Sequence, residues 1–177
     1  MCIRDRWEAG SLLTRMTASL EAAGRPVPDH MRLLEQEHRD GLGEVFLAQR
    51  CFWVGEMEIG QIEGVVTTEA GFMHGHEVTR VRHDRRVLPL DELVDKAARR
   101  NVADAVFSND PELARLEAHI SSRAPGRYRV APASDQKRQL GRPRRGVVYT
   151  ASQLTKLNAF ATSGRGAADR YLFPSQR

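Results

Sequence analysis

The chain has 177 residues, of which 41% are hydrophobic and 28% charged, a balance typical of one well-cored domain with an appendage. It has no apolar run long enough to cross a membrane and no hydrophobic region of a signal peptide. Its only cysteines, Cys2 and Cys51, exclude a disulfide framework, and their spacing makes no zinc site. We therefore expect a cytoplasmic protein with no metal and no membrane partner.

The formal net charge of +4 comes mostly from the C-terminal half of the chain. The basic residues there lie in a segment rich in proline and glycine, with only Tyr128 and Tyr149 nearby. A nucleic-acid surface would interleave more aromatic residues with the basic ones. The pattern favours a solvated loop surface, and nucleic-acid binding is the minor alternative.

Helical spacing of apolar residues predicts a first helix over residues 7–23, which Gly24 ends. The six residues before it have no periodic signal. Pro26 and Pro28 then break the chain, and Asp29 is expected to cap a second helix that runs through Glu37. Residues 1–40 are therefore interpreted as a helical lead-in or as the tail of a preceding domain.

The central part of the chain, residues 41–122, reads strand, helix, strand, strand, helix, strand. In chain order these elements are expected at residues 44–49, 51–62, 65–72, 76–83, 89–97 and 101–107. This order predicts an α+β fold of the ferredoxin-like, split βαβ type, in which two helices cover one face of an antiparallel sheet.

The remaining segment, residues 123–177, is predicted to be a basic loop followed by a helical extension. A further helix is expected from Asp110 to about Ser122, before this loop. Thr150 and Gln153 fit a capping box, and the helix that they open should bury an apolar side. That side is made of Leu154, Leu157, Phe160 and Ala161, while residues 164–177 should lie mostly on the surface.

Cys51 follows the first strand of this central part and stands where the next helix should begin. Unpaired N–H groups and the helix dipole stabilise an anion at such a position, so a thiol there becomes a thiolate more easily. The alternative is a buried cysteine packed with Phe52 and Trp53 in the core. Composition alone favours this alternative.

The motif around Cys51 resembles the A-type peptide-methionine sulfoxide reductases. The family reads Gly-Cys-Phe-Trp-Gly, then a helix with a glutamate, then a Gly-Val…Thr…Gly-Tyr strand and a Gly-His-x-Glu stretch. Here the matching blocks are Cys51-Phe52-Trp53, Glu56, Gly64 to Phe72, and Gly75-His76-Glu77 followed by His83-Asp84. The resemblance covers roughly residues 44–100. The chain also resembles a divergent branch in which such a half follows a thioredoxin-like half, which implies that residues 7–40 are the end of that first half.

This resemblance implies reduction of the S epimer of methionine sulfoxide in peptides or proteins, with four residues in named roles. Cys51 would attack the sulfoxide sulfur and pass through a sulfenic acid. Phe52 and Trp53 would form an apolar wall around the substrate methyl group, and Glu77 would protonate the departing oxygen. Without the resemblance, Glu77 would be interpreted as an exposed strand carboxylate paired with Arg80 or Arg82.

The sequence also departs from the family pattern. Arg50 and Val54 replace the two glycines of the cysteine motif. The connection from Gly71 to Glu77 is shortened, and a family tyrosine that binds the sulfoxide oxygen is missing from it. A second family tyrosine corresponds to Lys137. His74 or His76 could substitute, and we place His76 among the substrate-binding residues, with an ordinary loop role as the alternative.

No cysteine follows Cys51, so an external thiol such as thioredoxin or glutaredoxin would have to reduce the sulfenic acid. We expect no cofactor and a monomer. Two further functions stay open: a thiol oxidoreductase that acts on another substrate, and an inactive scaffold or binding domain in which Cys51 is inert.

Overall fold

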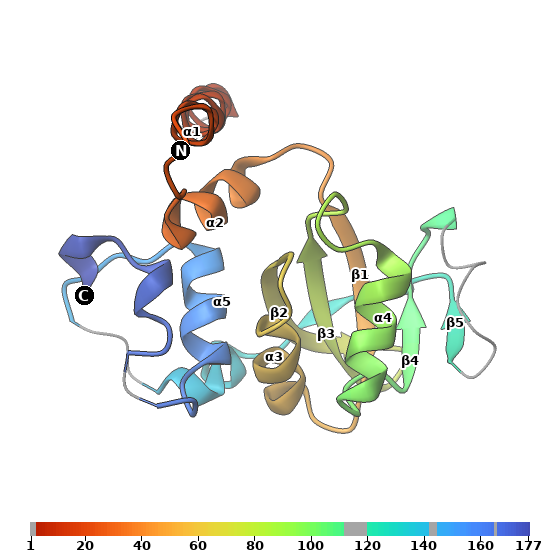
Figure 1. Cartoon of the computed structure of the whole chain (residues 1–177). Helices are drawn as coiled ribbons and strands as arrows, with labels where there is room; N and C mark the ends of the chain where they lie inside the picture. Colours follow the sequence, from red (N-terminus) through yellow and green to blue (C-terminus); the bar gives the residue numbers. More distant parts are fainter. Residues whose placement is uncertain (1–2, 112–119, 142–144, 165) are drawn as a thin grey trace.

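A six-stranded sheet forms the centre of the computed structural model, which describes residues 3–111, 120–141, 145–164 and 166–177 (Figure 1). The strand order is β5-β4-β1-β3-β2-β6. The strands are β1 (Gly43–Ala48), β2 (Val65–Met73), β3 (His76–His83), β4 (Ala105–Phe107), β5 (Ser121–Arg123) and β6 (Arg129–Val130). Together with helices, they make the α+β fold that the sequence predicts.

Helices α3 (Phe52–Gly60) and α4 (Leu90–Arg99) connect the strands in the predicted order. The chain runs β1, α3, β2, β3, α4, β4, and the pairs β1–β3, β1–β4 and β2–β3 are antiparallel. A short strand is added at each edge, with β5 parallel to β4 and β6 antiparallel to β2. The predicted succession of these six elements is thus confirmed.

An apolar core fills the space between the sheet and the helices α3 and α4. Val45 and Leu47 alternate along β1 and point to this face. The core continues through both helices and the segments that flank them: Ile59, Ile62, Val65, Val81, Leu88, Leu90, Leu93, Val94, Ala97, Val102, Ala103 and Val106. Burial of these side chains fixes both helices on one face of the sheet.

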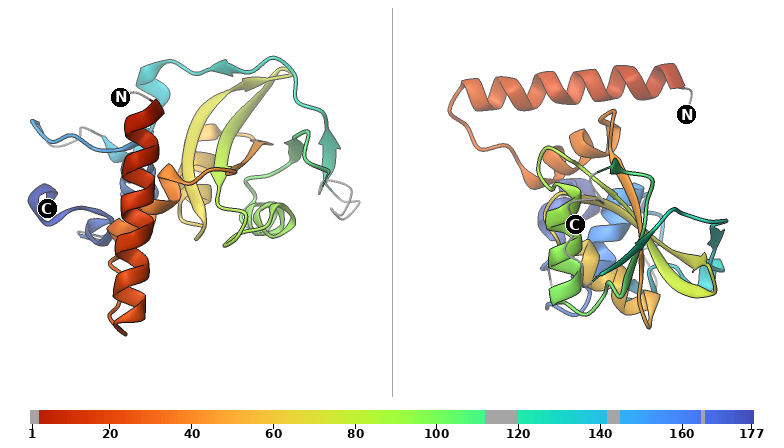
Figure 2. Two further views of the ribbon diagram at one scale, coloured as in Figure 1. Left: turned by 90° about the horizontal axis from the view of Figure 1, so that it is seen from above. Right: turned by 90° about the vertical axis from the view of Figure 1, so that its right-hand side faces the viewer.

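A smaller apolar cluster lies on the opposite face. Its buried members are Phe46, Ala48, Met73, Val78 and Phe107, and the ring of Tyr128 packs against them. Tyr128 comes from the extended segment that crosses this side of the sheet (Figure 2). A Cβ atom at Gly71 would come within 2.2 Å of the Tyr128 ring, so the close approach requires glycine.

The N-terminal helices α1 (Ile3–Ala22) and α2 (Asp29–His38) pack against each other, and α1 stands apart from the sheet (Figure 2). The first helix starts earlier than predicted. It also includes residues 3–6, which have no apolar periodicity. The proposed capping role of Asp29 is wrong: Pro28 is the N-cap residue and Asp29 lies in the first helical turn.

The segment after β4 departs from the predicted helix. Residues 112–119 of that helix lie outside the described residues, and Ser121–Arg123 form strand β5 instead of a helix end. The following segment is largely irregular, as predicted, apart from β6 and two short 3₁₀ turns, η2 (Ala133–Asp135) and η3 (Arg138–Leu140).

Helix α5 (Ala151–Ala159) begins with the predicted capping box, in which Thr150 Oγ1 accepts a hydrogen bond from the Gln153 backbone N–H at 3.2 Å. The predicted apolar side is wrong, since the buried side is mainly polar: Ser152, Gln153, Thr155, Lys156, Asn158 and Ala159. The tail contains the 3₁₀ turns η4 (Asp169–Tyr171) and η5 (Pro174–Gln176), and it buries Leu172. Across the described ranges, every helix is too short or too polar to cross a membrane.

Candidate active site

Cys51 occupies the corner between β1 and α3. Its backbone is extended, with φ −150° and ψ 112°, and it is the N-cap residue of α3. The Gly55 N–H donates the first helical hydrogen bond to the Cys51 carbonyl at 3.0 Å. The thiol group belongs to a half-buried residue, which differs from the fully buried core position considered as the alternative. The helix therefore begins where the sequence predicts.

Gly55 lets this end of α3 lie close to the sheet. A Cβ atom at this position would come within 2.5 Å of Gln49 Nε2 and 2.6 Å of Thr79 Oγ1. Gln49 and Thr79 are buried and hydrogen bonded to each other beneath the helix. The glycine thus sets how closely Cys51 approaches strand β3, which carries Glu77.

Glu77 lies directly at the N-terminus of α3. Its Oε2 atom accepts a hydrogen bond from the Phe52 backbone N–H at 2.9 Å, and its carbonyl accepts one from the Gln49 N–H at 3.2 Å. Cys51 and Phe52 share a peptide bond, so the structure brings the two predicted catalytic residues together. A carboxylate is favoured at this end of a helix because the first N–H groups lack helical partners.

The alternative prediction pairs Glu77 with Arg80 or Arg82. In the structure, Arg80 is paired with other carboxylates. The Arg80 guanidinium pairs with Glu44 at 2.8 Å and with Glu69 at 3.2 Å. Burial acts to lower the pKa of Arg80, but the hydrogen bonds and charges of Glu44 and Glu69 together outweigh it and raise the pKa.

Three aromatic side chains form a wall beside this corner. The Phe52 ring lies 6.1 Å from the Trp53 ring and 5.4 Å from the Phe72 ring, both in edge-to-face contacts. Phe72 pairs directly with Glu77 across strands β2 and β3. From the sequence, Phe72 was predicted to lie in a strand and was given no role in the site. Its pairing with Glu77 across the two strands places it at the site.

Two arginines cover the outer surface of this wall. The Arg129 guanidinium lies 4.3 Å from the Phe72 ring centroid, and that of Arg138 lies 5.4 Å from the Trp53 ring centroid. Both arginines are exposed. They come from β6 and η3, far from Cys51 in the sequence, so no local pattern could have assigned them to the site.

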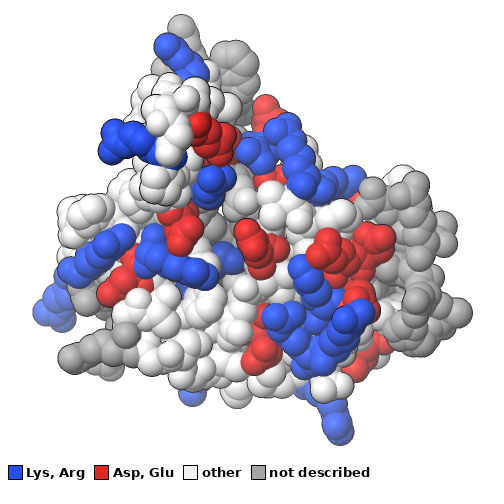
Figure 3. All heavy atoms as spheres, in the orientation of Figure 1, with Lys and Arg blue, Asp and Glu red and all other residues white. Residues whose placement is uncertain are grey.

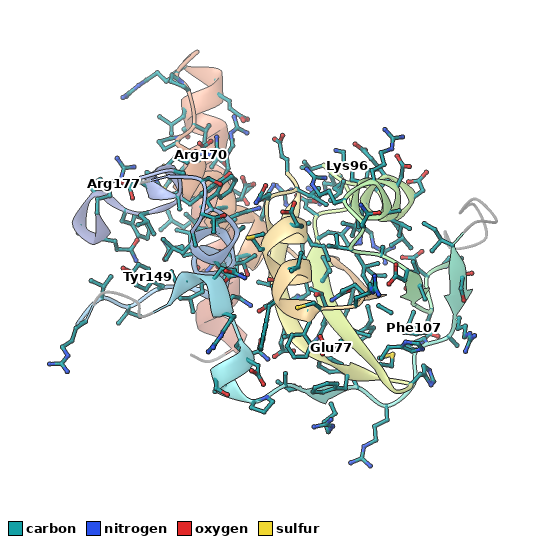
Figure 4. All side chains as sticks on the ribbon, turned by 90° about the horizontal axis from the view of Figure 1, so that it is seen from below. Glu77, Lys96, Phe107, Tyr149, Arg170 and Arg177 are labelled. Atoms are coloured by element: carbon teal, nitrogen blue, oxygen red, sulfur yellow. The ribbon has the colours of Figure 1, made fainter. Side chains whose placement is uncertain are left out.

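The histidines are not brought to this cluster. The His76 ring packs 6.2 Å from the Phe107 ring, and the His74 ring packs 5.1 Å from it (Phe107 and Glu77 are labelled in Figure 4). Phe107 belongs to the apolar cluster on the sheet face opposite α3. Because successive side chains on a strand point to opposite faces, His76 faces away from the side on which Glu77 lies. The structure does not support its placement among the substrate-binding residues.

Lys137, which corresponds to a family tyrosine, is used inside the fold. Its backbone is left-handed, with φ 50°, and its N–H donates to Glu56 Oε2 at 2.8 Å. The ammonium group also forms an ion pair with Glu56, which is fully buried, and donates to the Thr68 carbonyl. Tyr128 is also engaged elsewhere, since its hydroxyl donates to Glu69 Oε2 at 3.1 Å. Burial, together with the Glu69 charge, raises the pKa of Tyr128.

A cleft of about 390 Å³ lies beside β2. Its lining includes Thr68, Glu69, Gln136, Lys137 and Leu154, but not Cys51 or Glu77. Several lining groups are already engaged: Glu69 pairs with Arg80 at 3.2 Å, and Lys137 donates to the Thr68 carbonyl. We therefore place the candidate site at the half-buried corner around Cys51, outside this cleft. In the described ranges, no group of three or more His, Cys, Asp or Glu side chains is arranged to hold a metal ion.

Comparison with known proteins agrees with the resemblance read from the motif. No protein-family model matches the chain. A curated relative, the peptide methionine sulfoxide reductase MsrA of Vibrio vulnificus (strain CMCP6), is 33% identical over 73 residues, which covers 32% of this chain and 35% of the relative. The chain therefore spans about a third of the length of this relative.

Two solved structures are also similar. Methionine sulfoxide reductase A of Corynebacterium diphtheriae is 20% identical with a TM-score of 0.48, covering 70% of this chain and 89% of that one. The oxidised form of Mxr1 from Saccharomyces cerevisiae is 18% identical with a TM-score of 0.42, covering 51% and 76%. The match to the curated relative by itself makes the chain similar to the A-type methionine sulfoxide reductases, as the sequence predicts.

Proposed function

We propose that the chain reduces methionine (S)-sulfoxide in peptides or proteins, with Cys51 as the nucleophile. One observation carries the proposal: Cys51 is the N-cap residue of α3, and the Glu77 carboxylate accepts the next backbone N–H at 2.9 Å. The sequence match to a curated peptide methionine sulfoxide reductase supports the same function.

Each residue of the corner has a role in the proposed reaction. The Cys51 thiol gives its proton to the Glu77 carboxylate as the sulfur attacks the sulfoxide sulfur, and Glu77 returns this proton to the departing oxygen. The oxygen is transferred to Cys51, so that the product is methionine and Cys51 becomes a sulfenic acid. The wall of Phe52, Trp53 and Phe72 contacts the methyl group and stem of the substrate.

Two external thiols complete the cycle. The first forms a disulfide with Cys51 and releases water, and the second breaks that disulfide and restores the Cys51 thiol. A thioredoxin-like or glutaredoxin-like dithiol supplies both in one molecule, and the cytoplasm, where we place the protein, provides such reductants. No other cofactor enters the proposed reaction.

The proposal extends to the architecture. We assign β1, α3, β2, β3, α4 and β4 to a ferredoxin-like split βαβ unit, and the strand order β4-β1-β3-β2 with antiparallel neighbours supports this assignment. We propose residues 41–122 as the reductase-like domain, with residues 1–40 as a lead-in and residues 123–177 as an extension that also supplies Arg129 and Arg138 to the site.

The test is turnover of a methionine (S)-sulfoxide peptide with dithiothreitol as the reductant. We expect stereospecific reduction by the wild-type protein and none by Cys51→Ser. Glu77→Gln should lower kcat by about 10²-fold, because it removes the general acid. Cys2→Ser, the other cysteine, and Glu92→Gln, an exposed α4 carboxylate paired with Lys96, serve as matched controls that keep wild-type activity.

Two other outcomes would replace this function. Absence of turnover while Cys51 still alkylates rapidly at neutral pH would indicate a thiol oxidoreductase with a different substrate. Absence of turnover with an unreactive Cys51 would indicate an inactive scaffold.

A further inference from the structure

The surface around the candidate site is unevenly charged. The arginines Arg129 and Arg138 flank the aromatic wall next to Cys51, and Arg50 directly precedes Cys51 in the chain. All three are exposed. Among the described residues, neither Arg129 nor Arg138 forms an ion pair with a carboxylate, whereas Arg80, Arg99 and Lys137 each do. Basic side chains over α4 are likewise paired with acidic neighbours (Figure 3).

Stacking on the aromatic rings holds the two arginines in place. The face of a guanidinium packs on a ring by a cation–π contact, and its N–H edge stays free to form a bidentate pair with a carboxylate. The rings that hold Arg129 and Arg138 are those of Phe72 and Trp53, both in edge-to-face contact with Phe52 at the start of α3. The two positive edges therefore bracket the position where a substrate methionine would contact the wall.

We infer that Arg129 and Arg138 select anionic substrates, namely peptides in which acidic residues flank the methionine sulfoxide. This inference rests on the proposed function and names its substrate class. An acidic peptide fits better than a single-stranded nucleic acid, since the outer faces of Phe72 and Trp53 are covered by the arginines and do not offer platforms for stacking bases.

The first experiment compares three blocked peptides that carry a central methionine (S)-sulfoxide between glutamates, serines or lysines. We expect kcat/KM to fall from the glutamate peptide to the serine peptide to the lysine peptide. The change should be in KM, and kcat should stay the same. Arg129→Gln and Arg138→Gln should each lower kcat/KM for the glutamate peptide about threefold, the effect expected of an exposed charge pair. The serine peptide should be unaffected.

Controls in the same assay test whether the effect is local. Arg99→Gln removes an exposed arginine of α4 that pairs with Asp95, and it should leave the peptide preference unchanged. Raising sodium chloride from about 0.05 M to about 0.5 M should reduce the preference for the glutamate peptide, because the interaction is screened. Equal kcat/KM values for the three peptides, or a preference that survives both arginine substitutions, would overturn the inference while the reductase function stands.

A binding measurement separates failure of the inference from failure of the proposed function. Fluorescence anisotropy of labelled glutamate, serine and lysine peptides on the Cys51→Ser protein requires no turnover. Tighter binding of the glutamate peptide that is lost in Cys51→Ser/Arg129→Gln/Arg138→Gln supports the inference even if no peptide is reduced. Equal binding of the three peptides, or tighter binding of a single-stranded oligonucleotide of matched charge, overturns it.

Discussion

Helix α3 is packed on two sides by unlike surfaces. Between α3, the sheet and α4 lies the main apolar core, in which Ile59 is fully buried. Toward α5 and the segment before it, Glu56 pairs with Lys137, and the Gly60 carbonyl at the end of α3 accepts from Lys156 Nζ at 2.7 Å. Both sides are buried to a similar degree. The comparison shows that an apolar core and a polar one can be equally buried. Only the apolar core leaves a periodic pattern in the sequence.

The polar side depends on complete pairing, whereas the apolar side does not. A buried charge that loses its partner is strongly destabilising, and a buried ion pair replaced as a whole by apolar groups is often neutral. An apolar core instead loses stability in proportion to the volume removed. Three predictions test this difference, and they are given in order of decreasing expected effect.

The largest effect is expected for Lys137→Ala. Among the described residues, this change leaves the Glu56 carboxylate, which is 0% exposed, with the Thr68 hydroxyl and the residue 137 backbone N–H as its partners. We expect the free energy of unfolding to fall by about 4 kcal/mol, measured by urea denaturation. The paired change Glu56→Gln/Lys137→Met is the control and should recover most of the loss. If Lys137→Ala costs less than about 1 kcal/mol, the ion pair does not hold this side together.

A smaller loss is expected on the apolar side from Leu93→Ala. Leu93 is fully buried in the core between α4 and the sheet. Truncation should lower the free energy of unfolding by about 3 kcal/mol through lost transfer energy and the cavity left behind. Urea denaturation in low and high salt checks it, because the loss should be the same in both. A strong salt dependence would show that charges also support this side.

The smallest effect is a pH dependence that comes from Lys156. Burial, followed by the nearby Arg170 charge, lowers the pKa of Lys156 from 10.5 to about 8, although Glu63 acts in the opposite direction. Between these two values the unfolded chain holds the proton that the folded chain has released, so unfolding takes up a proton and rising pH favours the folded state. The wild type should gain about 2 kcal/mol over this interval relative to Lys156→Met.

Denaturation of both proteins at several pH values between 7.5 and 10.5 tests the Lys156 prediction, since other titrating groups cancel in the difference. The difference should begin to level off at the lower end of this range, because the folded chain then also holds the proton. A difference that stays flat across the whole range, or falls with pH, would contradict the lowered pKa.

The local features of the site were accessible from the sequence because each depends on neighbours in the chain. Cys51 is predicted at a strand-to-helix corner from the change in apolar spacing, and the structure places it as the α3 N-cap residue. Glu77 was reached through its position in the motif, and its strand is found with the predicted bounds. The capping box at Thr150 is likewise a pattern within four residues. These contacts are short in sequence, so residue spacing carries the information.

Two features depend on how side chains are oriented and partnered in the fold. His76 was predicted to bind the substrate in place of a missing family tyrosine, yet strand alternation turns its side chain to the face opposite that of Glu77. The apolar side predicted for α5 is not its buried side. Thr155 and Lys156 are buried instead, because they bond to β2 and to the end of α3, about ninety residues earlier in the chain. No periodic pattern in α5 reports such partners.

Apolar periodicity and motif spacing are therefore sufficient for the α+β order of the central elements, for the position of Cys51 at a helix start, and for the likeness to methionine sulfoxide reductases. Only the tertiary structure decides that Phe72, Arg129 and Arg138 border the site, that Lys137 serves Glu56, and that one side of α3 is sealed by polar groups. The physical reason is that the hydrophobic effect is non-directional and leaves a periodic trace in the chain. Hydrogen bonds, ion pairs and cation–π contacts are directional and are fixed only when distant segments meet.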